Sequence, residues 1–86
     1  MIKVLLWTEA AWHDYLYWQG QDKKVFKRIN QLIIDTQKNP FTGIGKPELL
    51  KESLAGLYSR KIDHYNRLVY AIDGTQLTII TCVIFE

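Results

Sequence analysis

The last eleven residues, QLTIITCVIFE, restrict the fold of this chain more than any other stretch. Apolar side chains occupy both sets of alternating positions along residues 76–86, which is typical of a strand that is covered on both faces or lies inside a sheet. Asp73-Gly74 precedes this run and predicts a tight hairpin to a strand at residues 66–72. A third strand is expected at residues 57–63, so this part of the chain should form a three-stranded antiparallel meander.

Two helices are expected before the meander. Residues 2–7 are apolar and indicate a first strand, and Thr8 follows in the position of a helix N-cap. A second helix is expected from Asp22 to Asn39-Pro40, with one face of buried side chains at helical spacing. The residues of that face are Val25, Ile29, Leu32, Ile33 and Thr36. Because few residues separate the two helices, we expect an antiparallel helical hairpin.

The order of these elements predicts an α+β fold in a single domain that spans residues 1–86. An N-terminal strand, a two-helix antiparallel hairpin and the meander would place both helices on one face of the sheet. Residues 40–56 hold both prolines of the chain and indicate an ordered loop, with one helical turn at its end. A chain of 86 residues can bury one modest core.

Composition excludes several classes of protein. A single cysteine, Cys82, excludes an internal disulfide, and neither histidine lies at a metal-site spacing from it, so we expect no metal and no cofactor. Apolar runs are too short to cross a bilayer, and the N-terminus lacks the features of a signal peptide. We therefore expect a cytoplasmic protein without membrane partners. The net charge of +2 permits nucleic acid as a partner without requiring it.

Charged residues of the loop are the first candidate site. Glu48 lies between Lys46 and Lys51. A carboxylate held between two ammonium groups stays ionised and can act as a base. Solvated loop charges are the simpler interpretation of the same three residues, because exposed pairs contribute little.

Basic residues of the predicted strands form a second candidate site. They would suit RNA phosphate if they line a sheet face that the helices leave uncovered, because arginine forms paired hydrogen bonds to phosphate and aromatic rings stack on bases. The residues are Arg60, Lys61 and Arg67, with Tyr58 and Tyr65 nearby. Residues 41–86 contain five Lys or Arg and five Asp or Glu, so no strong basic field is expected.

Four motifs then give the chain a resemblance to a known family. They are W-x-D-Y-L-Y-W at residues 12–18, G-x-G-K-P-E-x-L-K at 43–51, L-x-G-x-Y-S-R at 54–60 and R-L-V-Y at 67–70. In this order and with these gaps they strongly resemble the YoeB/Txe toxins of type II toxin–antitoxin systems, within the RelE/ParE superfamily. The resemblance covers nearly the whole chain and implies a RelE-like fold.

The resemblance implies an enzyme. Family members are metal-independent endoribonucleases that cut messenger RNA in the decoding site of the ribosome and thereby inhibit translation. The RNA 2′-hydroxyl attacks the adjacent phosphate, a carboxylate removes its proton, and an arginine offsets the charge that develops on phosphorus. By position, the carboxylate corresponds to Glu48 and the arginine to Arg67. The remaining positions expected to bind substrate are Lys46, Lys51, Arg60, Lys61, Tyr65 and Glu86.

The resemblance also implies partners. Each family toxin is held inactive by a cognate antitoxin, so we expect a YefM-like antitoxin, the ribosome and messenger RNA as partners. Operator DNA is expected only through the toxin–antitoxin complex, and a homodimer is a further expected assembly.

The end of the chain departs from the family pattern. The family has a histidine, which protonates the departing 5′-oxygen, followed by a terminal tyrosine that helps to seat the RNA. This chain has Phe85 and Glu86 in those positions, and Tyr65-Asn66 replaces an acidic–histidine pair before the arginine. Phenylalanine cannot transfer a proton, and a terminal carboxylate repels RNA. Because a positioned acid contributes roughly 10²- to 10⁴-fold in rate, we expect weakened or absent cleavage.

Several explanations of this ending stay open. The natural protein is a degenerate toxin that retains antitoxin binding, or its ending was altered to permit expression, or His64 supplies the proton. The third ranks last, because a turn histidine would have to reach the same oxygen. A catalytically inactive antitoxin-binding or co-repressor module is the alternative function, since the first helix carries more aromatic residues than the core can accept. A gyrase-directed toxin of the ParE type would share the fold without the Glu48 and Arg67 signature.

Overall fold

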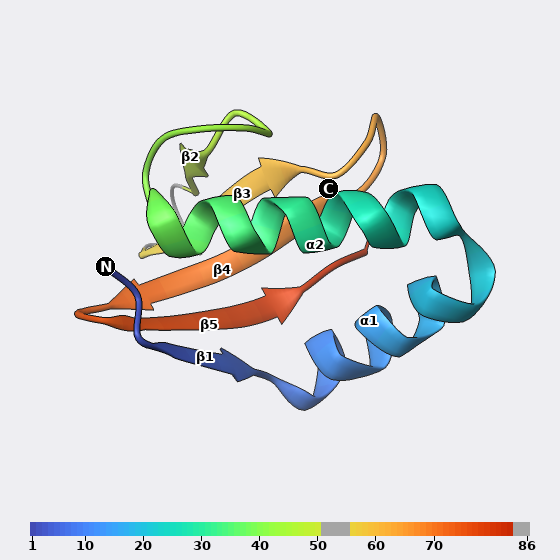
Figure 1. Ribbon diagram of the computed structural model, residues 1–86, viewed down its shortest axis with the longest axis horizontal. Helices are drawn as coiled ribbons and strands as arrows, with labels where there is room; N and C mark the ends of the chain where they lie inside the picture. Colours follow the sequence, from blue (N-terminus) through green and yellow to red (C-terminus); the bar gives the residue numbers. More distant parts are fainter. Residues whose placement is uncertain (51–55, 84–86) are drawn as a thin grey trace.

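A computed structural model describes residues 1–50 and 56–83 as a five-stranded mixed sheet with two helices packed on one face (Figure 1). The elements are β1 Val4–Trp7, α1 Glu9–Gln21, α2 Lys23–Lys38, β2 Glu48–Leu49, β3 Leu57–Lys61, β4 Arg67–Asp73 and β5 Gln76–Thr81. The strand order is β1-β5-β4-β3-β2, in which β1 runs parallel to β5 and the other neighbours are antiparallel. The predicted α+β fold and its meander, β3 to β5, are confirmed.

The helical hairpin forms where the sequence predicts it. Thr8 caps α1 by accepting a hydrogen bond from the Ala11 amide, and α1 continues one residue beyond Gly20. Asp22 begins α2 directly, because its carboxylate accepts from the amides of Lys24 and Val25. Asp22 is both the C-cap of α1 and the N-cap of α2, so no loop separates the helices and α1 turns back against α2.

The core lies between α2 and the central strands. All five residues of the predicted α2 face are buried, and the four apolar ones form one cluster with Leu68, Tyr70, Leu77 and Ile79. Along α1 only Ala11 is fully buried, whereas Trp12 and Tyr17 are 45% and 55% exposed. The expectation that the α1 aromatics exceed what the core accepts is therefore confirmed.

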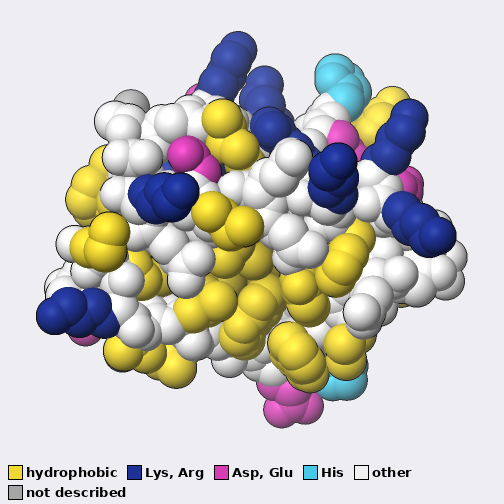
Figure 2. All heavy atoms as spheres, viewed as in Figure 1, with side chains coloured by type: hydrophobic (Ala, Val, Ile, Leu, Met, Phe, Trp, Pro, Cys, Tyr) yellow, Lys and Arg dark blue, Asp and Glu magenta, His cyan; other side chains and the backbone are white. Residues whose placement is uncertain are grey.

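One face of the molecule carries most of its visible Lys and Arg side chains above a mainly apolar region. Figure 2 shows Lys and Arg side chains spread over the upper part of this face, where α2 and the following loop lie, and hydrophobic side chains gathered below α2. Four aromatic rings from β1, α1 and α2 form a connected set of contacts, namely Trp7, Trp12, Tyr15 and Phe26. Their mutual contacts join β1 to both helices. None of the helices in residues 1–50 and 56–83 is long and apolar enough to cross a membrane.

The strand predicted at residues 76–86 is too long. β5 ends at Thr81, Cys82 and Val83 leave the strand, and residues 84–86 lie outside the described part of the chain. A β-bulge sets Val69 opposite Thr81 and Tyr70 opposite Ile79. Because the bulge inserts one residue, Ile79 and Cys82 both reach the core, although strict alternation would put them on opposite faces. As expected from its apolar composition, β5 is an interior strand, between β1 and β4.

The loop predicted at residues 40–56 contains a strand that was not predicted, and the helical turn expected at its end falls largely on residues 51–55, outside the described part of the chain. Glu48–Leu49 forms β2, which pairs antiparallel with β3 at the edge of the sheet. The pairing is short, with Glu48 opposite Ser59 and Leu49 opposite Tyr58. It brings the loop carboxylate into the sheet, and this placement decides the geometry of the candidate site.

Candidate functional site

Strand register puts Glu48 and Arg67 on the same face of the sheet, the face opposite the helices. Glu48 pairs with Ser59, Ser59 pairs with Val69, and Arg67 lies two residues from Val69 on β4. Side chains of directly paired strand residues, and of residues two apart on one strand, share a face. From the spacing of strands and the rise per residue, the Cα atoms of Glu48 and Arg67 lie about 12 Å apart.

Between Glu48 and Arg67 this sheet face carries one exposed basic residue and two buried residues. Lys61 pairs with Arg67 and therefore points to the same face, and it is exposed. Ser59 and Val69, which lie between Glu48 and Arg67, are 6% and 1% exposed. Glu48 is exposed.

A tight turn before β4 holds Arg67. The Asp63 carboxylate accepts hydrogen bonds from the amides of Tyr65 and Asn66 and from the Asn66 side chain. Burial raises the pKa of Asp63, but these hydrogen bonds outweigh that effect and lower it below its usual value. The Arg67 guanidinium bends back over the turn and donates to the carbonyl of Asp63 at 3.3 Å. The turn thus orients Arg67 and ends β3 two residues before the predicted boundary.

His64 and Tyr65 lie at the tip of this turn. Both are exposed, Tyr65 to 69%, and their rings meet edge to face at 4.9 Å between centroids. Tyr65 is therefore positioned to stack on a base that approaches Arg67. His64, the alternative proton donor, lies in the turn that precedes Arg67. Its ring contacts the ring of Tyr65.

The position of Arg60 does not fit its predicted role in binding substrate. Expected to bind substrate, it has no exposed surface, and its side chain points under α2, on the face opposite Lys61. Its Nη1 donates to Asp35 Oδ2 at 2.6 Å, and its Nε donates to the Tyr70 hydroxyl at 3.2 Å. The physical reason is strand alternation, which sends successive residues of β3 to opposite faces. A side chain buried in this way cannot contact RNA in this structure.

Arg60 instead anchors the loop that leads to Glu48. Its guanidinium donates to the backbone carbonyls of Asn39, Thr42 and Ile44. Tyr70 completes the anchor, because its hydroxyl donates to the Pro40 carbonyl at 2.8 Å. We name this set, Asp35, Arg60 and Tyr70, the loop anchor. Sequence reasoning missed Asp35 and Tyr70, and the available signal was that a buried strand arginine requires an acidic partner.

The loop then passes from the anchor to β2. The Lys61 amide donates to the Gly45 carbonyl at 2.7 Å, and Lys46 follows with a left-handed backbone, φ 52°. Lys46 is exposed next to Glu48. The other predicted site residues, Lys51, Phe85 and Glu86, lie outside the described residues.

Comparison with known proteins identifies the family. A family model described as a YoeB-like toxin of bacterial type II toxin–antitoxin systems matches residues 7–85. The chain belongs to the YoeB toxin family. Toxin YoeB of Escherichia coli (strain K12) is 53% identical over 78 residues, which cover 91% of this chain and 93% of that protein.

Solved YoeB structures share the whole fold. The YoeB dimer from Staphylococcus aureus superposes with a TM-score of 0.91 at 40% identity and covers 100% of both chains. A chain of the heterotetrameric YoeB–YefM toxin–antitoxin complex from the same organism superposes with a TM-score of 0.89 at 40% identity, covering 100% of this chain and 99% of its own. The predicted membership of the YoeB family and the predicted RelE-like fold are thereby confirmed.

Proposed function

We propose that this YoeB family toxin is a ribosome-dependent messenger RNA endoribonuclease by ancestry, with weakened or absent cleavage in the present sequence. The observation that carries the proposal is the shared sheet face of Glu48 and Arg67, with Lys61 between them. The mechanism is general base catalysis with electrostatic stabilisation of the transition state, and it uses groups of the chain alone.

In this mechanism Glu48 removes the proton of an RNA 2′-hydroxyl. The 2′-oxygen forms a bond to the adjacent phosphorus as the bond from phosphorus to the 5′-oxygen breaks, which yields a 2′,3′-cyclic phosphate and a 5′-hydroxyl. Arg67 offsets the added negative charge on the phosphoryl oxygens, and Lys61 supports it as a point charge. The departing 5′-oxygen requires a proton, and Phe85 stands where the family places the histidine that donates it.

Partners follow from the same kinship. We propose a YefM-like antitoxin as the inhibitor, because YoeB of Staphylococcus aureus forms a complex with YefM. A homodimer is proposed from the YoeB dimer of that organism. Operator DNA would be reached through the antitoxin, and the ribosome and its messenger RNA through the sheet face that carries Glu48 and Arg67.

The experiment compares messenger cleavage on purified ribosomes by four chains. These are the unaltered sequence, the double variant Phe85→His with Glu86→Tyr, the same double variant carrying Glu48→Gln, and a control double variant carrying Asp73→Asn. Asp73 is an exposed carboxylate at the other end of β4, in the turn to β5. The restored pair should raise cleavage roughly 10²- to 10⁴-fold, Glu48→Gln should abolish the gain, and Asp73→Asn should keep it.

Two outcomes would overturn this assignment. Brisk cleavage by the unaltered sequence would show that the acid is not missing, and a further His64→Gln variant would then test that residue as the donor. No gain from the restored pair in a correctly folded chain would reject the mechanism. In that case the alternative function, an inactive module that binds an antitoxin, is tested by co-expression with a YefM-like partner and size-exclusion chromatography.

A further inference from the structure

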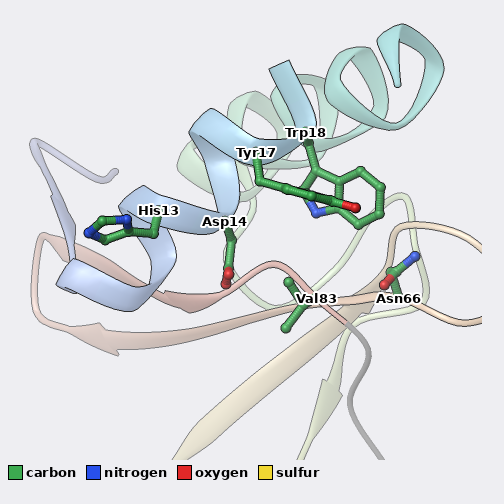
Figure 3. A pocket seen from close by; sticks show the side chains of 6 residues that line it. All are labelled: His13, Asp14, Tyr17, Trp18, Asn66 and Val83. Carbon is green, nitrogen blue, oxygen red and sulfur yellow. The ribbon is translucent and has the colours of Figure 1, made fainter. Parts of the chain in front are cut away.

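A hollow lies away from Glu48, between α1 and the end of β5. It has a volume of about 660 Å³ and is bordered by His13, Asp14, Tyr17, Trp18, Asn66 and Val83. Figure 3 shows Tyr17 and Trp18 on the α1 side and Val83 and Asn66 on the opposite side, with the Asp14 carboxylate pointing toward Val83. His13 points away from this group in the same view. We name this hollow the α1 pocket.

Hydrogen bonds fix the walls of the α1 pocket. The Trp18 indole nitrogen donates to the Cys82 carbonyl at 2.7 Å. Asp14 Oδ2 accepts from the Thr81 hydroxyl at 2.9 Å and from the Cys82 amide at 3.0 Å. Because both residues are tied to the end of β5, the pocket keeps its shape without a ligand, and a ligand loses less entropy when it binds.

One wall carries an unused acceptor. Asn66 is 6% exposed, and its Oδ1 atom is buried without a hydrogen-bond partner among the described residues. Its orientation is settled, because the amide nitrogen donates to both carboxylate oxygens of Asp63 at 3.2 and 3.1 Å. Figure 3 shows the oxygen on the side that faces Trp18 and Val83. A buried acceptor without a partner costs free energy, so the pocket is suited to a ligand that donates a hydrogen bond.

The residues that line the α1 pocket indicate which class of hydrogen-bond donor would bind there. The ring of Tyr17 is 55% exposed and meets Trp18 edge to face at 5.1 Å between centroids, which offers aromatic surface to a planar group. The described lining contains the Asp14 carboxylate and no Lys or Arg. A nucleotide would bring its phosphate toward this carboxylate, whereas a planar cation gains from the aromatic rings and the negative charge together.

We propose that the α1 pocket binds a guanidinium group, carried by an arginine of a partner polypeptide. The guanidinium stacks on Tyr17, donates one N–H to Asn66 Oδ1 and lies near the Asp14 carboxylate. This site is separate from the proposed ribonuclease site, because Asn66 and the neighbouring Arg67 send their side chains to opposite faces of the sheet. The proposal therefore does not depend on cleavage of RNA.

The test uses N-acetyl-L-argininamide as the probe and the ¹⁵N-labelled full chain. Its readouts are the Trp18 indole N–H and the Asn66 side-chain amide signals in a ¹H–¹⁵N spectrum. Both signals should shift and saturate with a dissociation constant on the order of 1 mM, as expected for a ligand of this size. N-acetyl-citrullinamide, which has the same shape without the charge, should bind at least severalfold more weakly.

Two variants at matched exposure complete the test. Tyr17→Leu should weaken binding of the probe by about two- to fivefold, since it removes the cation–π contact. Phe41→Leu is the control, because Phe41 is also 55% exposed and lies outside the pocket. The proposal fails if the probe leaves both signals unmoved, if the citrulline compound binds equally well, or if Tyr17→Leu behaves like Phe41→Leu. Stronger binding of adenosine or guanosine monophosphate would assign the pocket to a nucleobase instead.

Discussion

Arg60 and Asp35 form an ion pair of 2.6 Å in which the arginine side chain has no exposed surface and the aspartate is 24% exposed. The pair joins the middle of β3 to the last turn of α2, and through the arginine it also holds the backbone of residues 39–44. The loop that leads to Glu48 is thus held by a buried guanidinium group. Breaking such a pair costs more than forming it contributes, because the remaining charge stays out of water.

Arg60→Met should lower the free energy of unfolding by about 3–5 kcal/mol. The substitution keeps much of the side-chain volume but removes the charged donor to Asp35 and the donor to three loop carbonyls. Arg28→Met is the matched control, since Arg28 makes one exposed hydrogen bond, to the Lys61 carbonyl at 3.3 Å, and should lose less than 1 kcal/mol. Urea denaturation followed by tryptophan fluorescence measures both. Equal losses for the two variants would contradict the role assigned to the loop anchor.

Stability should fall in acid through Asp35. The hydrogen bond from Arg60 holds the pKa of Asp35 below its usual value of 3.8. A carboxylate with a lowered pKa in the folded state stabilises the fold above the unfolded pKa, and this contribution disappears as the pH falls through the folded pKa. The difference in unfolding free energy between the unaltered chain and Asp35→Asn should therefore be constant from pH 7 to 5 and shrink below about pH 4. A difference that grows in acid would refute this account.

Gly43→Ala should destabilise the fold, whereas Gly20→Ala should stabilise it. Gly43 has a φ of +121°, and a Cβ atom there would overlap the Asp35 carboxylate. Gly20 lies in α1 with open space around its Cβ position, so alanine there should add up to about 1 kcal/mol through helix propensity. Thermal unfolding followed by circular dichroism should show melting temperatures that move in opposite directions. Similar shifts for both variants would argue against close contact between the loop and Asp35.

Cys82 should resist alkylation in the folded chain. Burial, followed by the charge of Asp14, raises the pKa of the Cys82 thiol to about 12. The thiolate is the reactive form, and at pH 8 it would be present at roughly one part in 10⁴. Iodoacetamide at pH 8 should leave the native protein unmodified and label it fully in guanidinium chloride, as measured by mass spectrometry. Rapid labelling of the native chain would mean that the end of β5 opens easily.

Sequence reasoning found those features that depend on local pattern. The face of α2 follows a period of 3.6 residues, and all five predicted residues are buried because nothing interrupts the helix. Features that depend on pairing between distant segments were missed. The β2 strand depends on β3, and the bulge opposite Val69 and Tyr70 moves Cys82 into the core, although neither has a local signature.

In the candidate site too, local motifs were predicted and contacts between distant segments were missed. The motifs selected Glu48 and Arg67, and the register of β2, β3 and β4 then brought both to one face of the sheet. Arg60 was assigned to substrate on the basis of its chemistry alone. Its place under α2 depends on the phase of β3 and on a partner twenty-five residues earlier in the chain, neither of which a single sequence displays.

The position of β5 governs when this chain can fold. β1 lies at the edge of the sheet, and its neighbour β5 is separated from it by some seventy residues, as the hydrogen bond between Thr8 and Ile80 illustrates. During synthesis the first strand therefore has no sheet to join until residues 76–81 have left the ribosome exit tunnel. The first strand of the chain is thus among the last parts of the sheet to be fixed in place, because β5 is the neighbour with which it pairs in the described sheet.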